Sequence, residues 1–315
     1  MIIAVSLPLE DMTIRTYYYF KPKEGSLENC VHILVVKLIN DSVVIIICIF
    51  GAVGNGIVIW LLGFHIRRNP FSTYILNLAI ADLGVLLSVP FIVAYLWIVY
   101  LHIFPLMFLV FMFLFLSMYS SSQFLLTAIS INRCVAVFFP LWHRCHRPPH
   151  LSTIVCALIW VLSFLFTAVT YTLLFLNLEE KKMAACYQFI VNAVLCLPVM
   201  TIATVSLVIK VCLKARQHRR GKLLTIILLT LLFFLLFAFP LNVTAILDIF
   251  NYIPPDLPDV AIILACLNSS VNPAIYILVG RQWKSRQKES IKVVFQKIFK
   301  EEESCTEETP AETQL

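Results

Sequence analysis

Seven long apolar segments alternate with short polar stretches along this chain. A membrane-spanning helix needs about 20 mostly apolar residues, and each segment reaches that length. The pattern predicts an all-α membrane protein, a bundle of seven transmembrane helices. The predicted spans are Ser42–Phe64, Phe71–Leu96, Ile103–Val137, Leu151–Leu176, Tyr187–Cys212, Leu223–Ile249 and Asp259–Leu278.

Composition supports the same class. Of the 315 residues, 60% are hydrophobic and only 13% are charged, which is too apolar for a soluble domain of this size. We therefore expect an extracellular N-terminal tail over residues 1–41 and a membrane bundle over 42–280. An amphipathic helix on the membrane surface is predicted over 281–300, where apolar residues recur at helical spacing among Lys and Arg. Residues 301–315 form an acidic tail with the composition of a disordered segment.

Basic residues are distributed unevenly between the two sides of the predicted bundle. The loops after the first, third and fifth spans and the start of the tail hold 18 of the 24 Lys and Arg residues. The positive-inside rule places these stretches in the cytoplasm and the N-terminus outside. The net charge of +6 follows from this bias and does not indicate nucleic-acid binding. We expect a multi-pass protein of the plasma membrane.

Polar side chains at a few positions interrupt the apolar spans. A carboxylate or an amide is expensive in hydrocarbon unless it faces other polar groups, so these residues should meet inside the bundle. Their oxygen atoms suit a small cation such as Na⁺, and the alternative is a hydrated hydrogen-bond network without an ion. The residues concerned are Asn55, Asp82, Ser122, Asn268 and Asn272.

Several motifs resemble those of class A (rhodopsin-like) G-protein-coupled receptors, in particular the Mas-related group. The resemblance covers about residues 45–300, and its most discriminating part is the run from Trp142 to Pro148. The other matching stretches are Gly-x-x-Gly-Asn55, Arg67-Arg68-Asn69-Pro70-Phe71, Leu78-Ala-Ile-Ala-Asp82, Asn268-Ser-Ser-Val-Asn-Pro273 and Lys292-Val-Val-Phe.

The resemblance implies roles for individual residues. Asp82, Ser122, Asn268 and Asn272 fall on the sodium-pocket positions of the family. Arg133, Leu141 and Tyr276 would face a heterotrimeric G protein, with Leu141 as an apolar plug.

This chain also departs from the family pattern. Phe108 stands where many class A receptors have a cysteine at the outer end of the third helix. Cys30 and Cys186 are then the cysteines on the outer side, and a disulfide between them is predicted. Asn132 replaces the acid that usually precedes Arg133, and Ala238 replaces the usual Trp of the sixth helix.

The deep part of the predicted ligand cavity contains no acidic residue. No Asp or Glu lies in the third, fourth or fifth span, so a desolvated cation would have no partner there. A mostly apolar small molecule suits this cavity, whereas a basic peptide would bind at the rim, near Asp248. The residues expected to contact the ligand are Trp97, Phe111, Phe115, Tyr119, Thr170, Asn242 and Asp248.

The tail carries features for cytoplasmic partners. Ser304, Thr306 and Thr309 are candidate phosphorylation sites, and tail phosphorylation would recruit arrestin. The terminal residues, ending at Leu315, fit the Ser/Thr-x-apolar-carboxylate pattern that PDZ grooves bind, a short pattern that also arises by chance.

We expect a receptor that binds an extracellular peptide or apolar small molecule and activates a heterotrimeric G protein. One alternative is a receptor-like partner that modulates another receptor without signalling, which Asn132 and Ala238 favour. A transporter fits less well, since no inverted repeat is visible and Asp82 is the only deep carboxylate. No metal-ligand spacing, nucleophile elbow or phosphate loop indicates an enzyme, and no cofactor is expected beyond an allosteric Na⁺.

Overall fold

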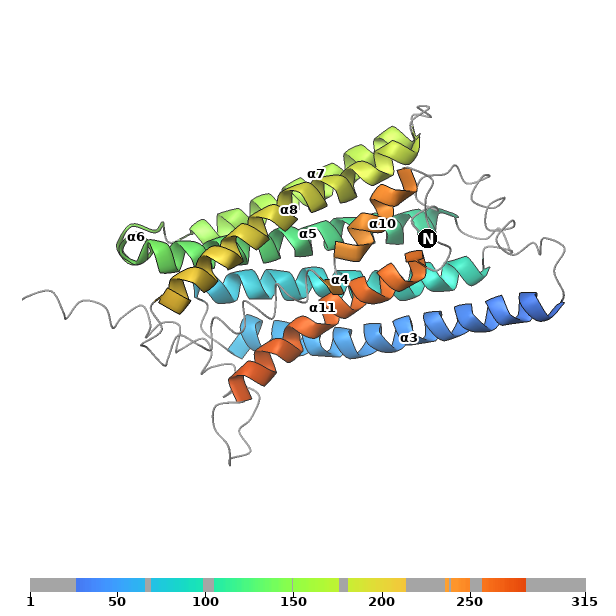
Figure 1. The fold of residues 1–315 in the computed structure, drawn as a ribbon, viewed down its shortest axis with the longest axis horizontal. Helices are drawn as coiled ribbons and strands as arrows, with labels where there is room; N and C mark the ends of the chain where they lie inside the picture. Colours follow the sequence, from blue (N-terminus) through green and yellow to red (C-terminus); the bar gives the residue numbers. More distant parts are fainter. Residues whose placement is uncertain are drawn as a thin grey trace, which may run out of the picture.

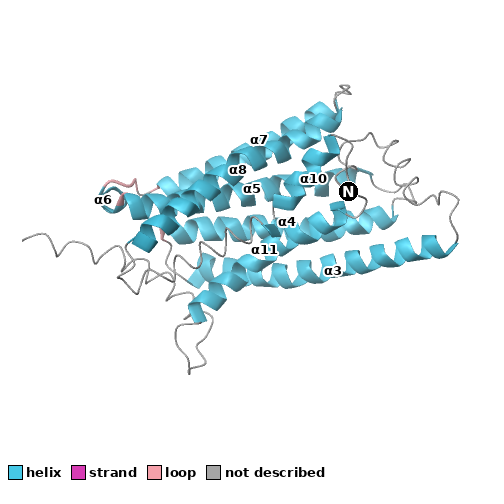
Figure 2. Cartoon of the chain, viewed as in Figure 1, coloured by secondary structure: helices cyan, strands magenta, loops and turns pink. Residues whose placement is uncertain are grey.

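The protein is a bundle of long helices that lie side by side, as Figure 1 shows for the computed structural model. The structure describes residues 27–65, 69–98, 105–148, 150–175, 181–213, 236–237, 239–249 and 257–281. Within these ranges the chain forms helices joined by short loops, without a strand (Figure 2).

Six helices in the described part of the chain are long and apolar enough to cross a membrane. They correspond to six of the predicted spans. The predicted sixth span, Leu223–Ile249, lies mostly outside the described residues, and its outer end forms α10 (Phe239–Ile249). A short helix, α6 (Pro140–Cys145), follows the third span. The long helices are α3 (Leu27–Trp60, continued by the π-helical turn η1, Leu61–His65), α4 (Pro70–Ile98), α5 (Pro105–Phe138), α7 (Leu151–Phe175), α8 (Lys181–Leu213) and α11 (Leu257–Arg281).

The first helix begins earlier than the sequence pattern predicts. Helix α3 starts at Leu27, whereas hydropathy placed the start of the span at Ser42. The extra turns carry polar residues, and the Asp41 carboxylate accepts a hydrogen bond of 2.8 Å from the indole of Trp97 at the outer end of α4. Hydropathy marks the part of a helix that lies in hydrocarbon, so it could not show this extension.

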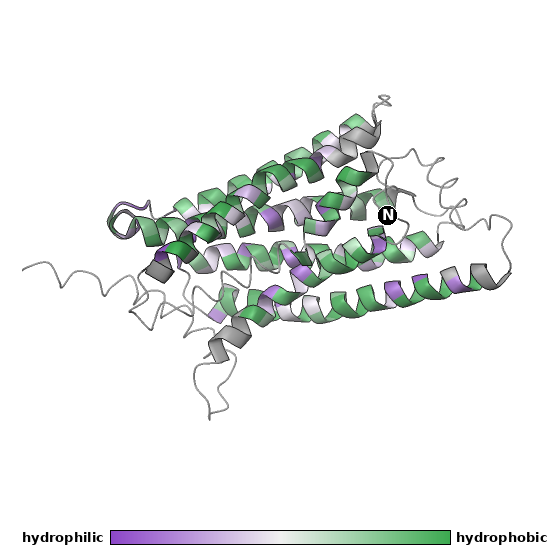
Figure 3. Ribbon diagram, viewed as in Figure 1, coloured by the Kyte–Doolittle hydropathy of each residue, from purple (hydrophilic) through white to green (hydrophobic). Residues whose placement is uncertain are grey.

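Helices α4 and α5 form the centre of the bundle. Helix α4 packs against α3, α5, α7 and α11, and α5 packs against α4, α7 and α8. Figure 3 shows apolar residues along most of each helix. The outer helices turn large apolar side chains outward, such as Phe50 of α3, which is 74% exposed. Such a surface is stable only in lipid, which fits the predicted spans.

Polar contacts define where helix α4 begins and join it to α7. Pro70 occupies its first position, where the missing N–H costs nothing. The Asn69 side chain accepts a 2.7 Å hydrogen bond from the Ser72 backbone N–H, and the Ser72 hydroxyl lies 2.8 Å from the Asn69 backbone nitrogen. Further along α4, Asn77 accepts a 2.9 Å hydrogen bond from the indole of Trp160 on α7.

Candidate functional site

The Asp82 carboxylate is the centre of a polar cluster where α4, α5 and α11 meet. It is fully buried. The Ser122 hydroxyl of α5 donates to Oδ1 at 2.7 Å, and the Asn272 amide of α11 donates to Oδ2 at 2.7 Å. The Ser269 side chain also interacts with this carboxylate. Three of the five residues predicted for the polar core therefore lie in direct contact, and Ser269 joins them.

The other two predicted residues lie beside this cluster. The Asn55 amide of α3 donates to the backbone carbonyls of Gly51 at 3.0 Å and Ser269 at 2.9 Å. Asn268 is buried in α11 next to Ser269. Asn55 thus holds α3 against the same turn of α11 that reaches Asp82, and its contact is to backbone and not to the carboxylate.

Close approach of α3 and α11 depends on Gly51. A methyl group at this position would collide with the Ser270 hydroxyl and would lie 2.8 Å from Leu86. The Ser270 hydroxyl in turn lies 3.2 Å from the backbone carbonyl of Ile47. The Gly-x-x-Gly-Asn55 motif therefore supplies both the space and the amide that join these two helices.

The structure reveals a second polar cluster, nearer the extracellular side, that connects α5, α7 and α8. The Gln188 amide lies 2.8 Å from the hydroxyls of Ser120 and Thr167, and the Asn192 amide lies 2.9 Å from the Ser120 hydroxyl. All four side chains are buried. Sequence analysis missed this cluster, although Gln188 and Asn192 stand one helical turn apart in an apolar span.

Two of the predicted ligand-contacting residues belong to a neighbouring polar group. The Asn242 amide of α10 lies 3.3 Å from the Gln123 side-chain oxygen of α5. The Tyr119 side chain interacts with both Gln123 and Asn242. The structure thus brings Tyr119 and Asn242 together, as a shared pocket requires, and adds Gln123 to them.

The aromatic residues predicted to contact the ligand pack against other aromatic rings in this structure. Phe115 stacks on Tyr119 with ring centroids 5.9 Å apart, and Phe111 stacks on Phe91 at 4.3 Å. Phe115 and Tyr119 are both buried, so neither ring is accessible from outside in this structure. Trp97 is engaged by Asp41, as described above, and the Thr170 hydroxyl donates to the backbone carbonyl of Phe166 at 3.0 Å.

Phe108 fills the outer end of α5 where many receptors have a disulfide cysteine. Its ring stacks on Tyr95 of α4 with centroids 4.7 Å apart, and the side chain is buried. An aromatic contact therefore joins α4 and α5 at this level. Cys30, Cys186, Asp248 and Tyr276 lie in described helices but outside the described side chains, so the predicted disulfide remains a prediction. Residues 282–315, with most of the predicted amphipathic helix and the tail, lie outside the described residues.

Arg133, at the cytoplasmic end of α5, is buried and not turned to the cytoplasm. Its side chain is only 3% exposed, and the guanidinium carbon lies 3.3 Å from the centroid of the Phe71 ring. Leu141 of α6 is 73% exposed on the same side of the bundle. The two described residues predicted to contact a G protein thus differ in accessibility. Leu141 is exposed, whereas Arg133 is buried against α4.

The run from Trp142 to Pro148 has a structural role in the loop after α5. Arg147 lies 2.6 Å from Nε2 of His143 and donates to the Ser152 hydroxyl at the start of α7. Burial, followed by the positive charges of Arg147 and Arg133, lowers the pKa of His143 below its ordinary value. His143 is therefore neutral at cytosolic pH and accepts the arginine N–H, which ties the loop to α7.

Comparison with known proteins identifies the class. Residues 54–276 match the family described as 7 transmembrane receptor (rhodopsin family). The chain is 37% identical over 265 residues to Proto-oncogene Mas of Rattus norvegicus, covering 80% of this chain and 81% of the relative. It is 36% identical over 285 residues to Mas-related G-protein coupled receptor member D of Homo sapiens, covering 84% and 86%. Member F of Homo sapiens is 37% identical over 272 residues, covering 84% and 79%.

The chain belongs to the rhodopsin family of seven-transmembrane receptors, and within it to the Mas-related group. The resemblance expected from its motifs is confirmed. The protein is a G-protein-coupled receptor and a multi-pass protein of the plasma membrane. The family match implies a bundle of seven transmembrane helices, and the described residues contain six helices long and apolar enough to be such spans.

Proposed function

We propose that this receptor binds an extracellular peptide or an apolar small molecule and activates a heterotrimeric G protein. The observation that carries the proposal is Arg133, a buried cation that contacts the ring of Phe71 at the cytoplasmic end of the bundle. A ring holds a cation less strongly than a buried carboxylate would, so the arginine can exchange this contact for one with a G protein.

The character of the ligand follows from the groups inside the outer half of the bundle. Among the described residues there, the polar side chains include the neutral groups of Gln188, Asn192, Ser120, Thr167 and Asn242. Neutral amides and hydroxyls bind neutral hydrogen-bonding groups, and the aromatic side chains around them favour apolar surface. A cationic ligand would place its charge at the rim, where the sequence carries Asp248, Asp256 and Asp259.

A sodium ion at Asp82 is part of the proposal. The carboxylate of Asp82, the hydroxyl of Ser122 and the side chain of Ser269 supply hard oxygen donors within one buried cluster. Binding of Na⁺ would require the Ser122 hydroxyl to turn its lone pairs inward while the carboxylate stays ionised. Without the ion, the same groups form the hydrogen-bond network described above.

The proposal of cytoplasmic partners other than the G protein is based on the sequence of the tail. Phosphorylation at Ser304, Thr306 and Thr309 would add negative charges for arrestin to bind. The carboxylate of Leu315 would bind a PDZ domain.

A second candidate function is a modulatory partner of another receptor, which does not itself activate a G protein. Asn132 favours it, because an altered residue beside Arg133 changes the surface that meets a G protein. The two functions differ in one observable property: only the first gives G-protein activation when no other receptor is present.

The test is a G-protein dissociation assay across all subtypes, in cells that express this receptor alone, with panels of basic peptides and apolar molecules. We expect an apolar or amphipathic agonist. Replacing Asp248, Asp256 and Asp259 by Asn should weaken a basic peptide at least tenfold and leave an apolar agonist unchanged. A potent small amine that is insensitive to this triple change would contradict the proposed cavity, and silence towards every ligand would favour the modulatory partner.

A further inference from the structure

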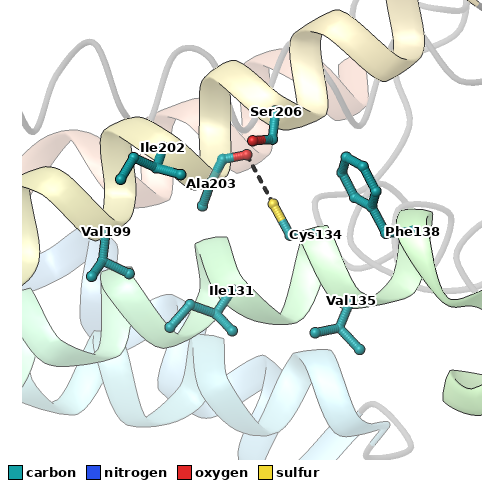
Figure 4. Close-up of a pocket in the computed structure, with 8 residues that line it drawn as sticks. All are labelled: Ile131, Cys134, Val135, Phe138, Val199, Ile202, Ala203 and Ser206. Atoms are coloured by element: carbon teal, nitrogen blue, oxygen red, sulfur yellow. Dashed lines mark hydrogen bonds between the residues drawn. The ribbon is translucent and has the colours of Figure 1, made fainter.

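An apolar groove runs along the outside of the bundle between the cytoplasmic halves of α5 and α8 (Figure 4). It has a volume of about 400 Å³. Its walls are formed by Ile131, Val135 and Phe138 from α5 and by Val199, Ile202 and Ala203 from α8. Ile202 is 66% exposed, so the groove opens towards the surroundings of the bundle and not towards its interior.

The chemistry of the groove excludes a polar occupant. Of its lining residues, only Cys134 and Ser206 carry a polar side-chain atom. The Cys134 thiol already donates to the backbone carbonyl of Ala203 at 2.8 Å, as the dashed line in Figure 4 shows. Both helices cross the membrane, so the hydrocarbon of the cytoplasmic leaflet surrounds the opening.

A cation stands at the cytoplasmic end of the groove. The Lys210 ammonium lies 4.1 Å from the centroid of the Phe138 ring, which is itself part of the wall. Lys210 is in the last turn of α8. From Val199 to Lys210 a helix rises about 16 Å, which is close to the hydrocarbon depth of one leaflet, about 15 Å. The lining residues of α8 end at Ser206, and Lys210 stands one helical turn further, so the groove together with Lys210 covers a distance comparable to one leaflet and has a positive charge at its cytoplasmic end.

We propose that this groove binds one acyl chain of an anionic phospholipid from the cytoplasmic leaflet, with the lipid phosphate on Lys210. Apolar walls match the chain, the distance from Val199 to Lys210 matches the depth of one leaflet, and the cation matches the headgroup. The cytoplasmic leaflet is the one that holds the anionic lipids, and a basic residue at its surface attracts them. The bound chain would contact α5 at Cys134, directly after Arg133.

The first test uses the unaltered protein. The receptor is placed in nanodiscs that contain phosphatidylcholine and a small fraction of phosphatidylserine with a photoactivatable group midway along one acyl chain. After irradiation, mass spectrometry maps the labelled peptides. We expect labelling of residues 131–138 and 199–206 to exceed that of residues 158–166, a comparably exposed apolar stretch of α7. Equal labelling of the three stretches would show general lipid contact only and would overturn the proposal.

The second test separates the headgroup from the chain. Lys210→Gln should weaken phosphatidylserine binding in native mass spectrometry about fivefold, the effect of one basic residue at the membrane surface. Ala203→Leu should fill the groove and weaken phosphatidylserine and phosphatidylcholine alike. The matched controls are Lys37→Gln on the outer part of α3 and Ala168→Leu on the exposed face of α7, and neither should change binding.

Three results with the variants would also overturn the proposal. Phosphatidylserine binding could be unaffected by both groove variants, or Lys37→Gln could weaken it as much as Lys210→Gln. Alternatively, Ala203→Leu could change receptor self-association and leave lipid binding intact, which would make the groove a contact between two copies. Thermal unfolding of each variant shows whether it is folded, and the photolabelling result stands independently of any variant.

Discussion

The central guanidinium carbon of Arg133 lies 3.3 Å from the centroid of the Phe71 ring. The preceding residue, Asn132, is neutral, so no carboxylate stands next to the arginine in the chain. The Phe71 ring of α4 is one contact of this cation, and a desolvated contact of this kind contributes about 2 kcal/mol. Under the proposed function, Arg133 would have to leave Phe71 to contact a G protein, so we expect this pair to restrain the resting receptor.

Phe71→Leu should raise ligand-free G-protein activation several-fold at matched surface expression. Leucine keeps most of the buried volume but removes the aromatic face, so the arginine is released while the start of α4 stays packed. A loss of about 1.4 kcal/mol from the resting state changes a two-state equilibrium tenfold. The measurement is ligand-free G-protein dissociation in cells.

Phe139→Leu is the matched control for this change. Phe139 lies in the same region, is 63% exposed and should leave ligand-free activation unchanged. If Phe71→Leu gave the same ligand-free signal as the parent receptor, the Phe71 ring would contribute only to packing and would not hold Arg133 in the resting receptor.

Asp82→Asn should abolish stabilisation of the receptor by sodium. A ligand that binds only the folded state raises the unfolding temperature, and an uncharged amide lacks the negative charge that would offset Na⁺ in this buried cluster. Unfolding temperatures are compared in sodium chloride and in an organic-cation chloride of equal ionic strength. Asp41→Asn, which changes the carboxylate bound to Trp97, should keep the sodium effect. A parent receptor that unfolds at the same temperature in both salts would reduce the cluster to a hydrogen-bond network.

The loop after α5 should become less stable as the pH falls below about 6.5, the ordinary pKa of histidine. The pKa of His143 is lower in the folded protein than in the unfolded chain, so the unfolded chain binds the proton more readily in this range. Protonation also removes the lone pair that accepts the Arg147 N–H. Hydrogen exchange of residues 139–148 should therefore be faster at pH 5.5 than at pH 7.5, after correction for intrinsic rates. In His143→Gln this difference should shrink, and an undiminished difference would assign it to another group.

Gly51→Ala should destabilise the bundle, whereas Gly56→Ala should not. The added methyl group collides with Ser270 at position 51 and meets nothing within 4 Å at position 56. Overpacking costs about 1–3 kcal/mol, while alanine in a helix is otherwise favoured over glycine by about 1 kcal/mol. Thermal unfolding of the two variants gives the comparison on a single helix. Equal unfolding temperatures would mean that α3 and α11 move apart without cost.

Sequence alone predicted the parts of the structure that depend on hydropathy and on isolated polar groups. A carboxylate in an apolar span needs hydrogen-bond partners inside the bundle, so the sequence predicted polar contacts for Asp82. In the structure these partners are Ser122 and Asn272. Asn55 was expected at the same place but bonds to the backbone of Ser269 instead, since its reach depends on how α3 is rotated.

Other contacts could not be read from the chain. The pairing of Arg133 with Phe71 joins residues of two helices, and nothing in the local sequence of either fixes which side chain the arginine meets. The cluster around Gln188 joins Gln188 and Asn192 of α8 to Ser120 of α5 and Thr167 of α7, and the pair on α8 does not show which hydroxyls of the other helices it meets. Such contacts follow from helix rotation and tilt, which hydropathy does not specify.

The most direct test of the account is nucleotide exchange on purified heterotrimeric G proteins of each subtype, with the receptor in nanodiscs and no other receptor present. We predict that the receptor accelerates exchange on at least one subtype, that Phe71→Leu accelerates it further and that Arg133→Ala abolishes both effects. Exchange that stays at the spontaneous rate for every subtype, with Phe71→Leu as with the parent receptor, would contradict the assignment of G-protein activation to this chain.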